Sequence, residues 1–264
     1  MTIDLLLHRF RPIRKRHLSL MRQVATIQHG LLDQSTSLGF LWSFLHPLVM
    51  LGVLYAFFRQ RVGEGVPNYA VYLLIGLVQF THFSKSTSAG MRVLHRMRDL
   101  ATNVIFPKDV LVYSALLADL PEFVISLAAT VIIAVATGVT PSWAFLMLPV
   151  VVFLQMLTVV WMALLLSAMY VVVRDLDHIF EVGMRLLFFI TPIIYHLDML
   201  SPRLRAIALL NPMAHLIGFA RTIVLEGRVP PLVQLGVYFA INLVLGYVAI
   251  ILFRRAEPAL VERL

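Results

Sequence analysis

The stretch FFITPIIYHLDMLSPRLRAIALLNPMAHLIGF, residues 188–219, begins like the end of a membrane helix. Apolar residues continue beyond Tyr195, but Pro192, Pro202 and Pro212 interrupt them, with charged and polar side chains between. The segment is therefore too broken to cross a bilayer as one helix and too apolar for an ordinary loop. Irregular backbone persists at membrane depth only where protein or a wet cavity satisfies its polar groups.

The composition places the whole chain in a membrane. Of its 264 residues, 60% are hydrophobic and only 14% are charged, where a soluble domain carries about a quarter charged residues. The absence of cysteine excludes disulfides, thiolate chemistry and cysteine-based metal sites. The net charge of +8 fits the orientation of membrane spans better than nucleic-acid binding. The basic N-terminus leads into an amphipathic segment, so we expect no signal peptide.

Several apolar runs approach or exceed the roughly 20 residues that cross a bilayer as a helix. The expected fold is all-α and integral to the membrane, with six transmembrane helices in a single domain over 1–264. The predicted spans are 38–58, 68–88, 110–137, 143–173, 179–195 and 232–253. The expected parts of the domain are a cytoplasmic N-terminus with an interface helix (1–36), the six-span membrane domain (37–253) and a cytoplasmic tail (254–264).

Positive charge predicts how the spans are oriented. Lysine and arginine gather before the first span, after the second and in the tail, which favours a cytoplasmic location for both termini. The loop of about 36 residues between spans five and six then lies outside. We expect it to contain a re-entrant helix pair that caps the outer end of a pathway, with Pro202, Asn211 and Pro212 at its breaks. An interfacial loop on the membrane surface is the alternative interpretation.

Two cytoplasmic segments are amphipathic at helical spacing. In 17–33 an apolar stripe lies opposite a polar face, and we assign Arg22, Thr26 and His29 to a helix at the inner interface. In 89–101 a second stripe faces basic residues, which is typical of a helix that receives a partner on one side. The residues assigned to this second contact are Arg92, Leu94, His95, Arg96, Met97, Arg98 and Asp99.

Few ionisable residues occur inside the predicted spans, and such residues are functional candidates. Asp119 and Glu122 lie on one face of the third span, with Pro121 between them. They indicate a polar contact on a pathway or a hinge; the alternatives are a polar knot that ties helices together and a helix that starts deeper. A proton relay is disfavoured because no lysine or histidine partner is expected in the mid-membrane spans.

The fifth span begins with Arg174 and Asp175, and Glu181 and Arg185 follow at positions i and i+4. This spacing permits an ion pair within the helix, which would anchor its cytoplasmic end or face a pore mouth. Aromatic residues are dense on spans one and five, where they form interfacial belts or contact sugar rings. The candidates for a substrate pathway are Phe40, Trp42, Phe44, Tyr55, Phe188, Phe189 and Tyr195, of which Phe44 and Phe188 lie deepest.

Catalytic motifs are missing from the sequence. It contains no GxxxxGK[ST] phosphate-binding loop, no HExxH and no GxSxG, and its histidines lack metal-ligand spacing. We therefore assign no catalytic residue, no metal ligand and no cofactor to this chain. Active transport would have to draw its energy from another subunit.

Five segments in order resemble the membrane subunits of type-2 ABC exporters, specifically the polysaccharide, O-antigen and teichoic-acid exporters. They are LGFLWSFLHPLVMLGVLYAFF (38–58), RDLATNVIFPKDVL (98–111), RDLDHIFEVGMRLLFFITPIIY (174–195), LLNPMAHLIGFAR (209–221) and FRRAEPALVERL (253–264). Departures from the family pattern occur at GLLDQSTSLGF, near the inner mouth, and at ADLPE, in the third span.

The resemblance implies a homodimer that pairs with two copies of a separate ABC ATPase, which binds ATP and Mg. It also implies a coupling helix around 91–101, gate helices between spans five and six, and a pathway lined by spans one and five. The substrate would be a lipid-linked glycan that leaves the cytoplasm through the bacterial inner membrane, in contact with membrane lipids. A single subunit has no room for a wide channel, so the path would form between two copies.

Two other functions stay open. The first is a type-2 ABC permease that exports a drug or a small lipid, although relatives of that kind often carry a large extracytoplasmic insertion. The second is a membrane-embedded enzyme that uses Asp119 and Glu122 as catalytic carboxylates. The second would be active in the isolated chain without ATP.

Overall fold

The computed structural model describes residues 41–104 and 106–263, and every regular element in this part is a helix. The long helices are α3 (Leu41–Phe58), α4 (Tyr69–Arg96), α6 (Asp109–Ala136), α7 (Leu148–Val172), α8 (Leu176–Ile190) and α11 (Leu232–Arg263). The short ones are α5 (Arg98–Asn103), α9 (Pro202–Leu210), α10 (Pro212–Val224) and the 3-10 turns η1 (Gly63–Gly65), η2 (Trp143–Met147) and η3 (Leu197–Met199). The predicted all-α class is therefore confirmed.

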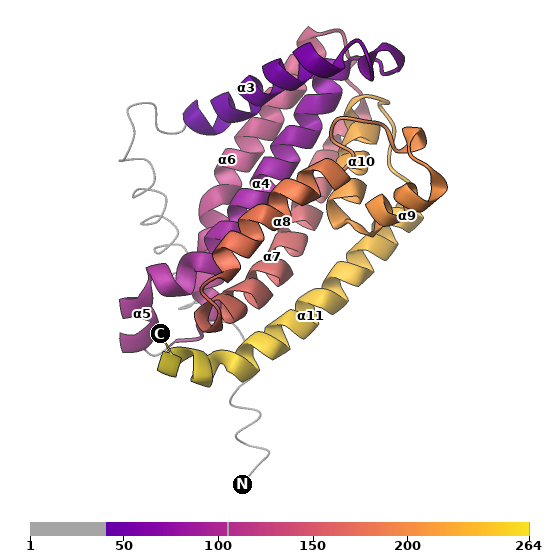
Figure 1. Cartoon of the computed structure of the whole chain (residues 1–264). Coiled ribbons are helices and arrows are strands. Elements are labelled where there is room, and N and C mark those ends of the chain that lie inside the picture. The colour runs from indigo at the N-terminus through magenta and orange to yellow at the C-terminus, as the bar shows by residue number, and fades with distance from the viewer. Residues whose placement is uncertain (1–40, 105, 264) are drawn as a thin grey trace.

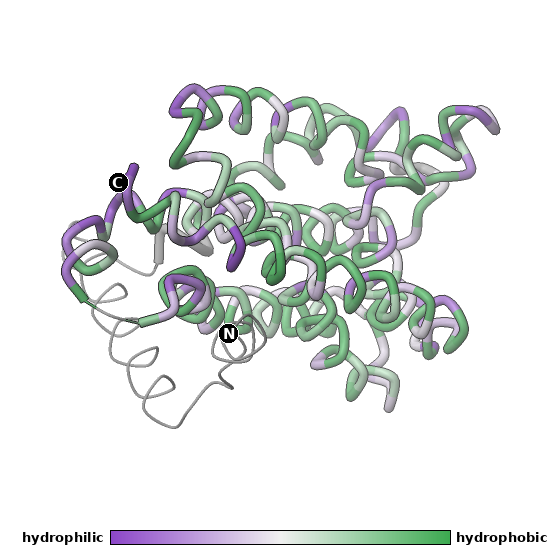
Figure 2. Tube along the Cα trace, turned by 90° about the horizontal axis from the view of Figure 1, so that it is seen from below, coloured by the Kyte–Doolittle hydropathy of each residue, from purple (hydrophilic) through white to green (hydrophobic). Residues whose placement is uncertain are grey.

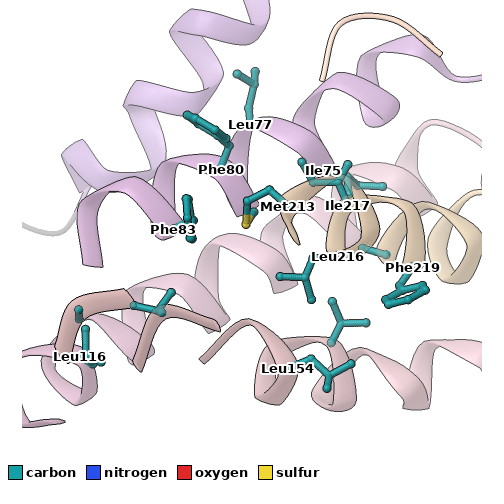
Figure 3. Close-up of a cluster of buried hydrophobic side chains, with 14 of the residues drawn as sticks. Ile75, Leu77, Phe80, Phe83, Leu116, Leu154, Met213, Leu216, Ile217 and Phe219 are labelled. Carbon is teal, nitrogen blue, oxygen red and sulfur yellow. The ribbon is translucent and has the colours of Figure 1, made fainter. Parts of the chain in front are cut away.

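Helix α4 lies at the centre of the bundle, between α6 and α7, and α3 and α10 also pack on it (Figure 1). Its residues 71–80 are all buried. Figure 3 shows part of this core, with Phe83 of α4, Leu116 of α6 and Met213 of α10 among its buried side chains. Because protein surrounds α4, it carries buried polar residues such as Gln79 and His82 that lipid-facing helices exclude.

Three described stretches are long and apolar enough to span a membrane: Asp109–Ala136, Trp143–Val172 and Leu232–Arg263. Figure 2 shows that hydrophobic residues dominate the long helices and that hydrophilic ones are most frequent near the two ends. Helices α9 and α10 reach that length only as a pair bent by 95°. The chain is thus a multi-pass membrane protein, and the count of six spans stays a prediction, because the second half of α4 carries polar and charged residues and α8 has only 15 residues.

The described helices correct two predicted boundaries. The expected separate helix over 89–101 is wrong, because α4 continues to Arg96 and α5 begins at Arg98. The expected fifth span over 179–195 is too long, because α8 ends at Ile190 and Thr191, before Pro192, is extended. The predicted break near Asn211–Pro212 is present as the junction of α9 and α10.

The bundle has two distinct ends (Figure 1). At one, called the α5 end, α5 lies near the C-terminal end of α11 and the start of α8. At the other, called the α9–α10 end, α9 and α10 lie near the connection between α3 and α4. The predicted interface-helix residues Arg22, Thr26 and His29, and Phe40 of the predicted pathway, lie outside the described residues.

Candidate functional site

A groove of about 600 Å³ lies between α3, α4 and α8. Its α4 wall carries the hydroxyls of Thr81, Ser84 and Ser88, at positions i, i+3 and i+7 on one helix face. Its α8 wall carries the apolar side chains of Phe180, Met184, Phe188 and Phe189 and the charged ones of Glu181 and Arg185. The groove therefore offers hydrogen-bonding groups on one side and aromatic rings on the other, which suits a ligand with both polar edges and apolar faces.

Two predicted pathway residues, Phe188 and Phe189, line this groove. The ring of Phe188 packs edge-on against Phe80 of α4 at a centroid distance of 5.4 Å. The side chains of Trp42 and Phe44 lie outside the described atoms, so their part in the groove stays a prediction.

The other two predicted pathway residues, Tyr55 and Tyr195, lie outside the groove lining, toward the α9–α10 end. Tyr55 stacks on Tyr69 with a centroid distance of 6.2 Å. The hydroxyl of Tyr195 donates to the backbone oxygen of Ile190 at 2.7 Å, so it satisfies a carbonyl at the end of α8. Both residues contact other parts of the chain, and their place on a substrate pathway stays a prediction.

Arg92 joins α4 to α8 at the α5 end of the groove. Its Nε donates to Asp177 Oδ1 at 2.6 Å, and its Nη2 donates to Glu181 Oε1 at 3.2 Å. The expected pair of Glu181 with Arg185 is therefore wrong, because Glu181 turns to the α4 arginine. In the described part of the chain, no carboxylate lies within 4.0 Å of the Arg185 guanidinium, which lines the groove. Arg174 and Asp175 are exposed in the turn before α8.

Asp119 and Glu122 have partners on α4 that the sequence interpretation missed. Lys85 forms an ion pair with Glu122 and lies 3.9 Å from Asp119 Oδ1, and Ser86 donates to Asp119 Oδ2 at 3.0 Å. The expectation that no lysine or histidine partners the two acids is wrong, because α4 packs on α6 and places Lys85 and His82 in the same polar cluster. These contacts favour the interpretation as a polar link between α4 and α6, because both carboxylates have partners. The signal was QFTHFSKSTS (79–88), a polar run inside a predicted span.

The predicted coupling residues separate into two groups in the structure. Leu94 is buried in the core, and Arg92 is engaged with α8. His95, Arg96, Arg98 and Asp99 are exposed, while Met97 lies between α4 and α5. The structure thus leaves an exposed, mainly basic surface at the α5 end, and the role of this surface stays a prediction.

The end of α11 packs against the start of α6 at the same end. Arg254 donates to Asp109 Oδ2 at 3.0 Å, and the backbone N–H of Lys108 donates to Glu257 Oε1 at 3.0 Å. Burial lowers the pKa of Lys108, whose ammonium donates to the backbone oxygen of Val104. Sequence reasoning treated these residues only as loop and tail charges, because the pairing joins segments about 145 residues apart.

At the α9–α10 end, Arg221 of α10 is buried and holds the broken backbone in place. Its guanidinium donates to the carbonyls of Pro192 at 2.6 Å, Ile193 at 2.9 Å and Tyr72 at 3.0 Å, and it lies 3.3 Å from the centroid of the Tyr72 ring. Gly76 leaves room for it, since a Cβ there would meet Arg221 Nη2 at 3.1 Å. The only sequence signal for this arginine was its place in the apolar run LIGFARTIV.

The three predicted gate residues shape the same end. Pro202 begins α9 and Pro212 begins α10, as proline does at first helical positions. Asn211 caps α10 by accepting from the backbone N–H of Met213 at 2.9 Å, and its amide donates to Thr191 Oγ1 at 2.6 Å. The segment 188–219 is therefore neither a span nor a free loop, because Asn211 within it and Arg221 just after it satisfy backbone groups where the helices break.

This combination of an apolar helical bundle, a lined groove and a bent helix pair describes a membrane permease rather than a soluble enzyme. The family model of the ABC-2 type transporter matches residues 31–225, and the chain belongs to that family. Members of the family are transport subunits that normally work with an ABC ATPase.

Three relatives extend the comparison. The chain is 34% identical over 226 residues to the O-antigen export system permease protein RfbA of Myxococcus xanthus, covering 84% of this chain and 87% of that protein. It is 26% identical over 195 residues to the RfbA protein of Klebsiella pneumoniae, covering 74% and 75%. It is 23% identical over 226 residues to the polysialic acid transport protein KpsM of Escherichia coli, covering 84% and 88%.

Proposed function

We propose that this chain is the membrane subunit of an ATP-driven exporter that moves a surface polysaccharide, joined to a lipid, across the bacterial inner membrane. The observation that carries the proposal is the similarity over most of the chain to permeases named for O-antigen export and polysialic acid transport. The groove supports it, because sugars pack their C–H faces on aromatic rings and bind hydroxyl groups at their edges.

The working unit is a homodimer with two copies of the ATPase. A groove of about 600 Å³ holds a small ligand but no polymer, so the polymer path forms between two copies of the chain. The outer face of α8 supports this arrangement, since Ile179, Val182, Leu186 and Phe189 are all more than half exposed. They repeat at i, i+3, i+7 and i+10, the spacing of a helix that packs on another helix.

The proposed topology has six spans and both termini in the cytoplasm, within a single domain over 1–264. The α5 end then faces the ATPase, which binds ATP and Mg and presses on the exposed residues His95, Arg96 and Arg98. The α9–α10 end forms the outer gate, as a re-entrant pair around Asn211. The chain itself supplies positioning and a path rather than catalysis.

A complementation experiment tests this function. A strain that lacks the gene should lose its surface glycan, and the wild-type chain should restore it only together with an ATPase whose phosphate-binding site is intact. Replacement of Phe188 by Ala should lower glycan export several-fold while complex assembly is retained. Trp143→Ala is the matched control, because that exposed ring lies in η2, away from the groove. Normal surface glycan in the deletion strain would contradict the proposal.

A further inference from the structure

The charges along the groove are unequally satisfied. Three cationic side chains line it, and two of them are engaged, because Lys85 pairs with Glu122 and Arg92 pairs with Asp177 and Glu181. Arg185 is the exception within the described residues, since no carboxylate lies within 4.0 Å of its guanidinium. Arg185 is exposed on the groove, and a guanidinium there without a counter-ion can take an anion from outside the described chain.

We propose that Arg185 is the docking point for the phosphate group that joins the glycan to its lipid. This assignment rests on the proposed function and names the part of the substrate that the groove recognises first. A guanidinium binds phosphate through two parallel N–H bonds, which a single carbonyl or hydroxyl cannot match. The rings of Phe180 and Phe188 flank the same lining and offer an apolar wall to the lipid chain or the first sugar.

The position of Arg185 along α8 fits such a group. It lies nine residues after Leu176, the first residue of the helix, or about 14 Å along the axis at 1.5 Å per residue. In the proposed topology this depth lies on the cytoplasmic side of the bilayer, within reach of a lipid phosphate in the inner leaflet. The hydroxyls of Thr81, Ser84 and Ser88 continue along the opposite wall, where they are available to sugar hydroxyls.

The test is a binding measurement on the full chain in complex with its ATPase, in phosphatidylcholine nanodiscs. The probes are a radiolabelled polyprenyl phosphate and the matched polyprenol without phosphate. Arg185→Gln should raise the Kd for the phosphate probe about 10-fold or more, which corresponds to the loss of a charge-assisted bond. The Kd of Arg185→Lys for the phosphate probe should fall between the values of the wild type and Arg185→Gln, because lysine keeps the charge and loses the paired geometry. The Kd for polyprenol should not change.

Arg203→Gln is the control, because Arg203 is exposed on α9, outside the groove. Equal Kd values for the phosphate probe in Arg185→Gln and the wild type would overturn the assignment. If Arg185→Gln fails to fold, a competition experiment on the wild type replaces it, in which each unlabelled compound displaces the labelled polyprenyl phosphate. If polyprenol displaces it as well as polyprenyl phosphate does, the assignment is also overturned. Displacement by equimolar phosphatidylglycerol would identify a general anionic-lipid site and would likewise overturn it. If Arg185→Gln binds the phosphate probe normally in a complex that still exports glycan, only this inference fails. If the wild-type complex exports no glycan, the proposed function fails.

Discussion

Two arginines show how differently the two ends of the molecule are held. Arg221, at the α9–α10 end, is 8% exposed and donates to three backbone carbonyls, with no carboxylate within 4.0 Å in the described part of the chain. Arg92, toward the α5 end, has a side chain that is 33% exposed and pairs with two carboxylates of α8. One arginine donates to backbone carbonyls where the helices break, and the other joins two helices through partly exposed charges.

The comparison teaches which end is fixed and which is free to rearrange. Losing Arg221 leaves the carbonyls of Pro192 and Ile193 without their side-chain donor where the helices break, and this cost is large. Losing Arg92 leaves carboxylates that water and counter-ions still solvate, so the cost is small. We therefore expect mutations at the α9–α10 end to change stability, and mutations of the α4–α8 contact to change activity.

The largest effect is expected from Arg221→Met. The substitution keeps much of the side-chain volume and removes every donor to Pro192, Ile193 and Tyr72, at a cost of about 3 kcal/mol. For a chain of this size that lowers the apparent Tm in detergent by roughly 10 °C. Arg203→Met is the matched control and should leave the Tm unchanged, since Arg203 is exposed on α9. Equal stability of the two variants would show that Arg221 does not hold the break.

A smaller loss is expected from Lys85→Met. It leaves Asp119 and Glu122 facing each other without their cation, at a cost of about 2 kcal/mol after allowing for the partial exposure of the lysine. Thermal unfolding in detergent measures the loss. Adding Asp119→Asn and Glu122→Gln should restore most of the stability, because the repulsion between carboxylates is removed. If export stays low in this stable triple variant, the three groups act on the pathway as well as in packing.

A third prediction separates Arg92 from the exposed arginines of the predicted coupling segment. Arg92→Gln should change stability by less than about 1 kcal/mol and leave the ATPase bound, while it lowers the ATPase activity that substrate stimulates. Arg96→Glu with Arg98→Glu should instead weaken co-purification of the ATPase, since both side chains are exposed at the α5 end. Loss of co-purification in Arg92→Gln alone would move Arg92 back into the docking surface.

The sequence predicted well what depends on local pattern. Helix positions followed from apolar length, and the break between α9 and α10 followed from Asn211 and Pro212, whose capping and ring chemistry act within a few residues. The fifth helix was drawn too long because apolar residues continue after Ile190, although Thr191–Pro192 ends the helix.

The sequence failed where a partner comes from another helix. Glu181 has Arg185 at the right local spacing, yet it pairs with Arg92 from α4. Lys85 lies inside the second predicted span, yet its contact with Glu122 of the third span was not foreseen. Arg221 reaches carbonyls as far as 149 residues away, which no periodicity encodes.

The smallest effect is expected from single cysteine substitutions, which test on which side of the membrane each end of the bundle lies. The chain contains no cysteine, so each label reports one position. Asn211 is buried and hydrogen-bonded, so Leu210, which is 84% exposed, is the better site at the α9–α10 end. Val104, 45% exposed near α5, is the matching site at the α5 end.

A membrane-impermeant thiol reagent should label Leu210→Cys in intact cells and Val104→Cys only after the membrane is opened. Both variants should export normally, because both side chains point away from the core. Labelling in the reverse order would invert the proposed topology, and it would place the basic surface of α5 on the wrong side for an ATPase.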